Sequence, residues 1–283
     1  MFRHLGPITT WTALYGVSIL LFGLLCGLHA KRLQLERKVW LTLSAAFLVG
    51  MTTGAKVLYD VQHDRLSLWA LFSIEHYFSG GLWGGVLAYL VLAVPTAWFV
   101  GKPSRPLKNS TQSTSGGVFP HATAATGDGR YDLQQAARPA ALDLVALPLP
   151  IPMILTKLGC LFNGCCHGGL SSMPWAVTFP QGAATAPPGV PLHPTQTYEI
   201  VTLVGVLIVF AVLGHDRWRG TMLPWFLIVY GVGRAVSEIW RADLQDRALV
   251  IGGVSSSQMV CLVGAVGAAL VLWRRRSRRV VDP

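Results

Sequence analysis

The sequence predicts an all-α integral membrane protein with seven transmembrane helices, its amino terminus outside and its carboxyl terminus in the cytoplasm. Three observations carry this prediction. Of the 283 residues, 52% are hydrophobic and only 13% are charged, whereas soluble domains carry about 25% charged residues. Several apolar runs meet the length of about 20 residues that a helix needs to cross a bilayer. Basic residues gather in alternate loops, as is typical of cytoplasmic loops.

Seven apolar runs are long enough to span, and we expect a helix in each: residues 11–28, 39–59, 80–100, 140–162, 197–214, 221–240 and 249–273. The first lacks a preceding basic region and a small-residue cleavage site, so we expect a retained helix and no cleavable signal peptide. The run 66–78 is shorter and carries Glu75 and His76, which favours a re-entrant or interfacial segment.

The distribution of basic residues predicts the orientation. The loops expected in the cytoplasm hold sixteen of the 23 Lys and Arg residues, and the opposite side holds four. Cytoplasmic loops carry such an excess. The same clustering beside membrane spans accounts for the net charge of +10, so we expect no nucleic-acid partner.

The chain reads as a single polytopic membrane domain over residues 1–283 with two long excursions. Residues 101–139 are rich in Ser, Thr, Gly and Ala, which predicts a mobile cytoplasmic loop. Residues 163–196 contain no Lys, Arg, Asp or Glu but six prolines, together with Trp175 and Phe179. A long uncharged segment with such aromatic residues favours a compact extracytoplasmic head at the membrane surface.

Ionisable residues within the expected helices are the first sign of a site. A charged side chain at the centre of a transmembrane helix costs about 2.5–3.5 kcal/mol, and Lys56, Lys157, Arg234 and Glu238 all fall within expected spans. The lysines could instead extend to the membrane surface. Arg234 and Glu238 are four residues apart and therefore share one helix face. Because guanidinium groups match phosphate oxygens, we predict a lipid-phosphate site near the outer leaflet.

The stretch "LGCLFNGCCHGG" at residues 158–169 leaves several roles open. The spacing of Cys160, Cys165, Cys166 and His167 is not a familiar zinc pattern, and we expect no metal. A disulfide on an oxidising outer face, inert packing, and a catalytic thiol or histidine remain alternatives. The other two cysteines sit within apolar helices, where a thiol is usually a small buried hydrophobe.

Three ordered blocks resemble the prolipoprotein diacylglyceryl transferases: "LGCLFNGCCHGGLSSMPWAVTFP", "LHPTQTYE" and "YGVGRAVSEIWRAD". "LYGVSILLFG", "GAKVLYD", "GGLWGG" and "VSSSQMV" extend the resemblance over most of the chain. It implies transfer of a diacylglyceryl group from phosphatidylglycerol to the lipobox cysteine of a prolipoprotein signal segment, leaving glycerol phosphate. It also implies a monomeric enzyme of the bacterial cytoplasmic (inner) membrane without a cofactor.

The resemblance supplies site residues position by position. We expect the catalytic residues to be Arg234, Glu238, Lys157, His167 and Cys165. We expect the lipid and substrate contacts to be Tyr15, Asn163, Gly168, Ser79, Arg241, His193 and Tyr198. Gln196 and Glu199 also match the family pattern.

This chain departs from the family within the central motif. Lys157 stands in place of an arginine, Cys160 in place of an asparagine and Cys165 in place of a glutamate, while Ser79 replaces a histidine. His76 or His167 could then serve as the base. Two other functions therefore stay open: a membrane thiol-redox protein using the three cysteines, and a non-catalytic relative that binds lipid or lipoprotein.

Overall fold

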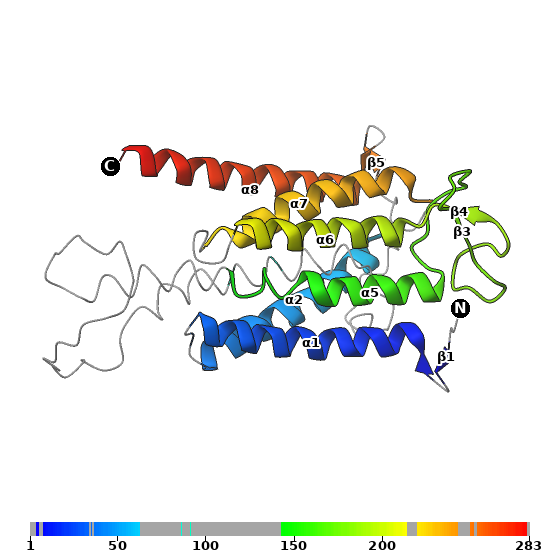
Figure 1. Ribbon diagram of the computed structural model, residues 1–283, viewed down its shortest axis with the longest axis horizontal. Helices are drawn as coiled ribbons and strands as arrows, with labels where there is room; N and C mark the ends of the chain where they lie inside the picture. The colour runs from blue at the N-terminus through cyan, green and yellow to red at the C-terminus, as the bar shows by residue number, and fades with distance from the viewer. Residues whose placement is uncertain are drawn as a thin grey trace, which may run out of the picture.

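A computed structural model describes residues 4–5, 8–33, 35, 37–62, 86, 91, 143–213, 220–242, 250–251 and 254–281. Most of its helices lie side by side along the long axis of the molecule, and short β-hairpins lie at one end (Figure 1). Apart from residues 86 and 91, the expected span 80–100, the run 66–78 and the loop 101–139 lie outside the described residues.

The described chain is mostly helical. Its helices are α1 (Thr10–Arg32), α2 (Arg37–Gln62), α5 (Pro150–Asn163), α6 (Thr195–Leu213), α7 (Met222–Ser237) and α8 (Ser256–Val281), with a 3-10 turn, η2 (Glu238–Trp240), after α7. Within the described residues, four stretches are long and apolar enough to cross a membrane: Thr10–Arg32, Thr195–Val212, Met222–Trp240 and Ser257–Arg275. The helices agree with an all-α integral membrane protein.

The helix expected over 140–162 is shorter than its apolar run. Residues 144–149 form turns, and α5 begins only at Pro150. Pro148, Pro150 and Pro152 explain the late start, because proline lacks the backbone N–H and disfavours helical geometry in the residue before it. The segment before α5 is nevertheless buried, with Leu144 and Leu149 in the main core.

The last helix also begins later than its apolar run at 249. Residues Val250–Ile251 (β5) and Val254–Ser255 (β6) form a small antiparallel hairpin before it. Ser255 and Gln258 then cap α8: the Gln258 N–H donates to Ser255 Oγ at 3.1 Å, and the Ser255 N–H donates to Gln258 Oε1 at 3.0 Å. This reciprocal pair satisfies backbone donors that a helix start leaves unpaired.

Two further hairpins lie at the same end of the bundle (Figure 1). The first joins β1 (His4–Leu5) to β2 (Ile8–Thr9), and the second joins β3 (Val177–Thr178) to β4 (Pro191–Leu192), both antiparallel. In the second, Val177 pairs with Leu192. Phe179, Ala186 and Leu192 form a small core beneath it, so residues 164–194 pack as a compact head.

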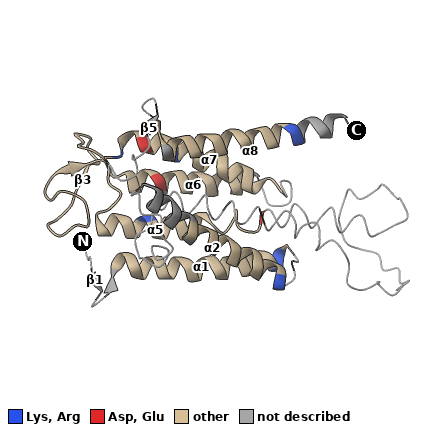
Figure 2. Ribbon diagram, turned by 180° about the vertical axis from the view of Figure 1, so that it is seen from behind, with Lys and Arg blue, Asp and Glu red and all other residues tan. Residues whose placement is uncertain are grey.

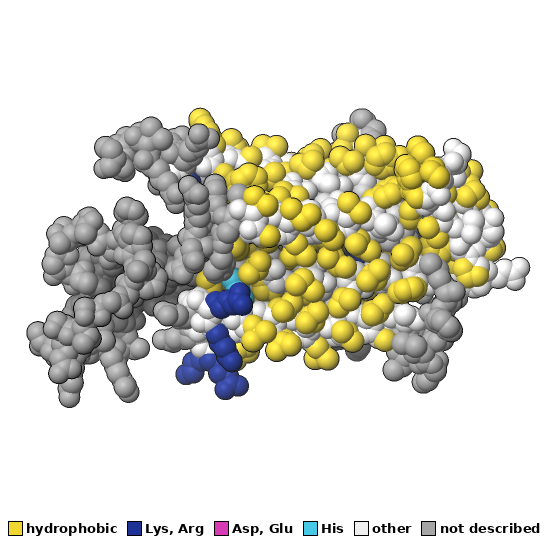
Figure 3. All heavy atoms as spheres, in the orientation of Figure 1, with side chains coloured by type: hydrophobic (Ala, Val, Ile, Leu, Met, Phe, Trp, Pro, Cys, Tyr) yellow, Lys and Arg dark blue, Asp and Glu magenta, His cyan; other side chains and the backbone are white. Residues whose placement is uncertain are grey.

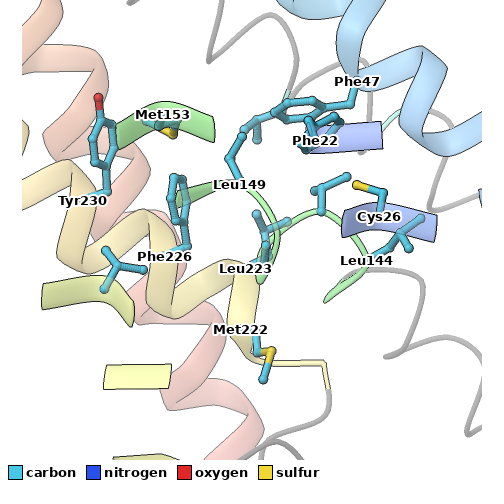
Figure 4. Packing of buried hydrophobic residues seen from close by; sticks show 14 of the residues in the cluster. Phe22, Cys26, Phe47, Leu144, Leu149, Met153, Met222, Leu223, Phe226 and Tyr230 are labelled. Atoms are coloured by element: carbon cyan, nitrogen blue, oxygen red, sulfur yellow. The ribbon is translucent and has the colours of Figure 1, made fainter. Parts of the chain in front are cut away.

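The main hydrophobic core lies between α1, α2, the start of α5, α6 and α7. Figure 4 shows Phe22 and Phe47 meeting Leu149, while Phe226 and Tyr230 approach from α7. Helices α6 and α7 approach closely, since a Cβ on Gly233 would lie 2.2 Å from Thr202 Cγ2. Small residues allow such close helix contacts in membranes.

The outer surface of the bundle is apolar along its length, and basic residues lie at one end (Figure 3). Leu20, Val212 and Val263 are each more than 70% exposed, as suits side chains that face lipid. The basic residues at the end of α1 and in α8 lie at the end opposite the hairpins (Figure 2).

Candidate functional site

A group of five Lys, Arg and Glu side chains lies buried inside the bundle, where charge is costly. They come from three helices and the turn after α7: Lys157 on α5, Glu199 on α6, Arg234 on α7, Glu238 at the start of η2, and Arg241 just after it. None is more than 4% exposed. We call these five residues the charge cluster.

Glu199 is the centre of the charge cluster. Lys157 Nζ donates to Glu199 Oε1 at 2.9 Å, and Tyr230 Oη donates to the other carboxylate oxygen at 3.2 Å. Arg234 Nε and Arg241 Nη1 lie 3.7 and 3.8 Å from Glu199 Oε1. One carboxylate therefore lies within 4 Å of three buried cations, and buried charges need such partners.

Glu238 is the second carboxylate of the cluster. Arg234, one turn earlier, forms an ion pair with it, and Arg241 Nε lies 3.7 Å from its Oε2. Ser255 Oγ donates to Oε1 at 3.2 Å, which ties the cluster to the start of α8. Three cations and two carboxylates leave the cluster with a formal charge of +1.

The loop after α5 lies beside this cluster. Gly164 ends the helix in the left-handed conformation with φ of +71°, which glycine adopts without steric cost. Cys166 has φ of 60° and is the one non-glycine residue with positive φ in the described chain. Thr195 Oγ1 donates to the Cys166 carbonyl and Gln196 Nε2 to the Cys165 carbonyl, each at 2.6 Å. The first turn of α6, which also carries Glu199, therefore holds the loop.

The loop brings three thiols together. The Sγ atoms of Cys160, Cys165 and Cys166 all lie within 4.8 Å of one another, and all are free thiols. Hydrogen bonds from the Cys160 and Cys165 thiols, helped by the charges of Arg241 and Lys157, hold the pKa of Cys166 well below its usual value, although burial opposes the shift. This thiol trio is the group of described residues whose ligand atoms lie close enough to share a metal ion.

Gly168 joins the loop to the segment carrying Arg241. It forms an antiparallel bridge with Arg241, and its N–H donates to the His193 carbonyl at 2.8 Å. A Cβ on Gly168 would lie 2.5 Å from the Trp240 carbonyl oxygen. Only glycine therefore permits this close approach.

Polar aromatic residues lie over the outer part of the site. His193 Nδ1 and Trp175 Nε1 are each 2.9 Å from the Tyr198 hydroxyl. The Tyr198 ring packs edge-on against Trp240, with ring centres 5.7 Å apart. Such side chains, apolar with one polar group, suit the boundary between membrane and water.

Other residues that the sequence predicted for the site make their contacts outside the charge cluster. His167 is buried in the head, where its Nδ1 lies 2.9 Å from the Gly168 carbonyl and its ring packs against Phe179. Tyr15 stacks on Trp11 in α1. Asn163 ends α5, and its carbonyl accepts the Ala184 N–H at 2.9 Å. Ser79, His76 and the side chain of Lys56 lie outside the described residues.

An apolar pocket lies between α1, α2 and α5. It is lined by Tyr15, Ser18, Ile19, Phe22, Phe47, Leu48, Met51, Leu149, Pro152, Met153 and Thr156. Thr156 immediately precedes Lys157. Thr156 thus lines the pocket beside α1, while Lys157, the next residue, contacts Glu199 on α6.

The sequence matched Glu199 to the family pattern but did not predict its central position among the buried charges. It is the only Asp, Glu, Lys or Arg in the 19 residues of α6. The cost of an intramembrane charge, which singled out Arg234 and Glu238, applies equally to it. That cost was the signal that could have found it.

Comparison with known proteins gives one consistent result. The family described as prolipoprotein diacylglyceryl transferase matches residues 113–274. The phosphatidylglycerol–prolipoprotein diacylglyceryl transferase of Geobacter sulfurreducens is 30% identical over 252 residues, which cover 85% of this chain and 89% of the relative. The enzyme of the same name from Rhodospirillum rubrum is 30% identical over 80% of this chain and 81% of its own length. This chain belongs to the prolipoprotein diacylglyceryl transferase family.

Proposed function

We propose that this protein transfers the diacylglyceryl group of phosphatidylglycerol to a cysteine thiol of a prolipoprotein. In this reaction the bond between the glyceryl carbon and the phosphate oxygen breaks, and a carbon–sulfur bond forms at the same carbon. Glycerol phosphate leaves, and the thiol proton passes to a base. The names of the relatives in Geobacter sulfurreducens and Rhodospirillum rubrum specify this donor and this class of acceptor.

The observation that carries the proposal is the formal +1 charge of the buried cluster. A phosphodiester carries a single negative charge, so phosphatidylglycerol would neutralise Lys157, Arg234 and Arg241 taken together with their two carboxylates. Two guanidinium groups supply planar pairs of N–H donors that match phosphate oxygens. Donors that are already in place stabilise the charge that grows on the phosphate as it leaves.

The apolar pocket supports the same donor. Its lining between Tyr15 and Met51 is almost wholly apolar, and it reaches Thr156, the neighbour of Lys157. An acyl chain of the donor would suit this apolar lining. We assign Tyr15 to this acyl site and Asn163 to the nearby headgroup.

The acceptor is expected to approach from the head. His193, Tyr198 and the loop at Gly168 are assigned to binding the prolipoprotein signal segment, because they lie between the head and the charge cluster. Cys165 and His167 are the assigned groups for activating its thiol, with Glu238 holding both arginines in place. The assignment of Ser79 to substrate binding remains a prediction from the family pattern.

The finer membrane arrangement is also proposed. Seven spans in the bacterial inner membrane, with the amino terminus and the head outside, would place the site where exported prolipoproteins arrive. The exposed basic residues Lys31, Arg32, Arg37 and Lys38 support this orientation, because positive charge favours the cytoplasmic side. We expect the protein to act as a monomer.

Complementation tests the proposed function in cells. Bacteria depleted of their own diacylglyceryl transferase should regain growth, and their lipoproteins should regain the diacylglyceryl modification, when this chain is expressed. An inactive control with Arg234→Ala should insert without restoring either. Absence of rescue by wild-type protein that is present in the membrane would instead favour a lipid-binding relative without catalysis.

A further inference from the structure

The thiol trio has the dimensions of a metal site. Zinc binds thiolate sulfur at about 2.3 Å, which places sulfur atoms that share one zinc ion about 3.8–4.0 Å apart. The Sγ atoms of Cys160, Cys165 and Cys166 are already within 4.8 Å of one another. Movements of about 1 Å or less, within the reach of side-chain rotation, would close them on a single ion.

The backbone is held in the conformation that brings these sulfurs together. Neighbouring side chains of an extended chain point to opposite sides, but the positive φ of Cys166 turns the loop so that both of its thiols face Cys160. A non-glycine residue in this region costs about 1–3 kcal/mol and persists only when its surroundings enforce it. Here Thr195 and Gln196 enforce it through the two carbonyls.

The neighbouring charges suit an anionic set of ligands. Lys157 lies three residues before Cys160 on α5, and Arg241 pairs with Gly168, two residues after Cys166. A zinc ion with three thiolates carries a formal charge of −1, so the occupied site would add no positive charge beside these cations. Within the described residues no fourth His, Cys, Asp or Glu belongs to the group, and His167 Nδ1 is engaged with the Gly168 carbonyl. Three protein ligands with an open fourth position are typical of catalytic zinc rather than structural zinc.

We propose that Cys160, Cys165 and Cys166 bind one zinc ion, and that its fourth position takes the thiol of the acceptor cysteine. This inference rests on the proposed diacylglyceryl transfer. A thiol that coordinates zinc is deprotonated outright, and the thiolate is the nucleophilic form of cysteine. The proton is released to solvent on binding. The bound thiolate then attacks the glyceryl carbon as the phosphate leaves towards Arg234 and Arg241, and the resulting thioether is a weaker ligand that departs.

The site would therefore activate the acceptor thiol through zinc acting as a Lewis acid, with the assigned Cys165 as one of its ligands. Within the described residues, the two carboxylates of the cluster are engaged with lysine and arginine, and His167 packs in the head. Zinc beside the phosphate-binding cations would bring the nucleophile and the leaving group to one place. Such positioning contributes a large share of catalysis in two-substrate reactions.

The first test measures the zinc content of the purified protein. Full-length protein, purified in detergent with a non-thiol reductant under anaerobic conditions, should contain about one zinc ion per chain by elemental mass spectrometry. Cys160→Ser, Cys165→Ser and Cys166→Ser should each lose most of it. Cys26→Ser and Cys261→Ser, which alter buried thiols elsewhere in the helices, should retain it. Size-exclusion elution confirms that each variant remains folded.

The open position is tested with cobalt in place of zinc. Cobalt-loaded protein should show tetrahedral ligand-field bands and sulfur-to-cobalt charge transfer, and the charge-transfer intensity should rise when a lipobox peptide is added. The same peptide with serine in place of its cysteine should leave the spectrum unchanged. Zinc content that survives all three serine substitutions, copper in place of zinc, or a disulfide within the trio would overturn the site.

The outcomes separate this inference from the proposed function. Diacylglyceryl transfer by fully metal-free protein would overturn the zinc site and leave the function standing. Zinc binding with the peptide-dependent spectral change, but without transfer from phosphatidylglycerol, would support the site and overturn the function. Zinc binding without any spectral response to the peptide would overturn the open acceptor position.

Discussion

Replacing Glu199 with glutamine tests whether one buried carboxylate holds the charge cluster together. Its Oε1 atom accepts a hydrogen bond from Lys157 at 2.9 Å and lies 3.7 and 3.8 Å from Arg234 and Arg241. Glutamine keeps the volume and one carbonyl oxygen but removes the charge. The formal charge of the cluster then rises from +1 to +2, with Glu238 as its remaining carboxylate.

The expected loss is large because the cluster is buried. Removing one partner of a buried ion pair costs about 3–5 kcal/mol, a roughly 10²- to 10⁴-fold rise in the unfolding constant. Replacing both partners by uncharged groups is often nearly neutral. The double variant Lys157→Met with Glu199→Gln should therefore be more stable than Glu199→Gln alone, yet remain inactive because a phosphate ligand is gone.

The assay is reversible unfolding in mixed micelles of mild detergent and sodium dodecyl sulfate, followed by tryptophan fluorescence. Lys31→Met, at an exposed position near the end of α1, is the control and should change the free energy of unfolding by less than about 0.5 kcal/mol. If Glu199→Gln had the same free energy of unfolding as the wild type, the role given to this carboxylate would be refuted. So would a double variant as unstable as the single one.

Three other substitutions have defined outcomes. Arg234→Lys keeps the charge but loses the two-pronged donor, so kcat/KM should fall roughly 10- to 150-fold. Membrane insertion should be unchanged. Turnover equal to that of the wild type would contradict the phosphate-binding role of Arg234. Gly168→Ala should lower both stability and transfer because its Cβ would meet a carbonyl at 2.5 Å, whereas Gly169→Ala has 3.9 Å of clearance and should behave as wild type. Asp143→Ala leaves two backbone N–H groups at the start of α7, including that of Met222, without their acceptor. It should cost about 1–3 kcal/mol per group in the unfolding assay, and Asp143→Asn, which keeps one acceptor oxygen, should cost less.

The sequence predicted the helices that correspond to long apolar runs. The apolar runs at 11–28, 197–214 and 221–240 correspond to α1, α6 and α7 within a few residues, because a helix that faces lipid needs an unbroken apolar stretch. The helix predicted over residues 140–162 was wrong at its start, because α5 begins only at Pro150. Hydropathy takes no account of the backbone N–H that proline lacks. Proline is tolerated in the first turn of a helix but not in its interior, so α5 begins at Pro150, with Pro152 in its first turn.

Short features escaped prediction for a physical reason. The hairpins contain strands of two residues each, too short for any alternation of side chains to be recognised. The convergence of Cys160 on Cys165 and Cys166 depends on the left-handed backbone at Cys166 and on α6 holding two loop carbonyls. Neither feature is visible in the spacing of the cysteines.

The charge cluster was predicted only in part from the charged residues within the expected membrane helices. Burial cost singled out Lys157, Arg234 and Glu238 from the sequence, and the structure brings all three together with Arg241 around Glu199. The cost of burial predicts that each charge has a partner but does not say which one. The partners are set by helix packing, which the sequence alone does not specify.

Transfer to a defined peptide tests the central claim most directly. Purified protein is incubated with a lipobox peptide in micelles that contain phosphatidylglycerol or, as the control, phosphatidylcholine. The mass of the peptide is then measured by mass spectrometry. The account predicts a mass increase of one diacylglyceryl group on the cysteine, with an equimolar release of glycerol phosphate, only with phosphatidylglycerol. A cysteine that stays unmodified, or that is recovered only as a disulfide, in the presence of folded protein and phosphatidylglycerol would contradict it.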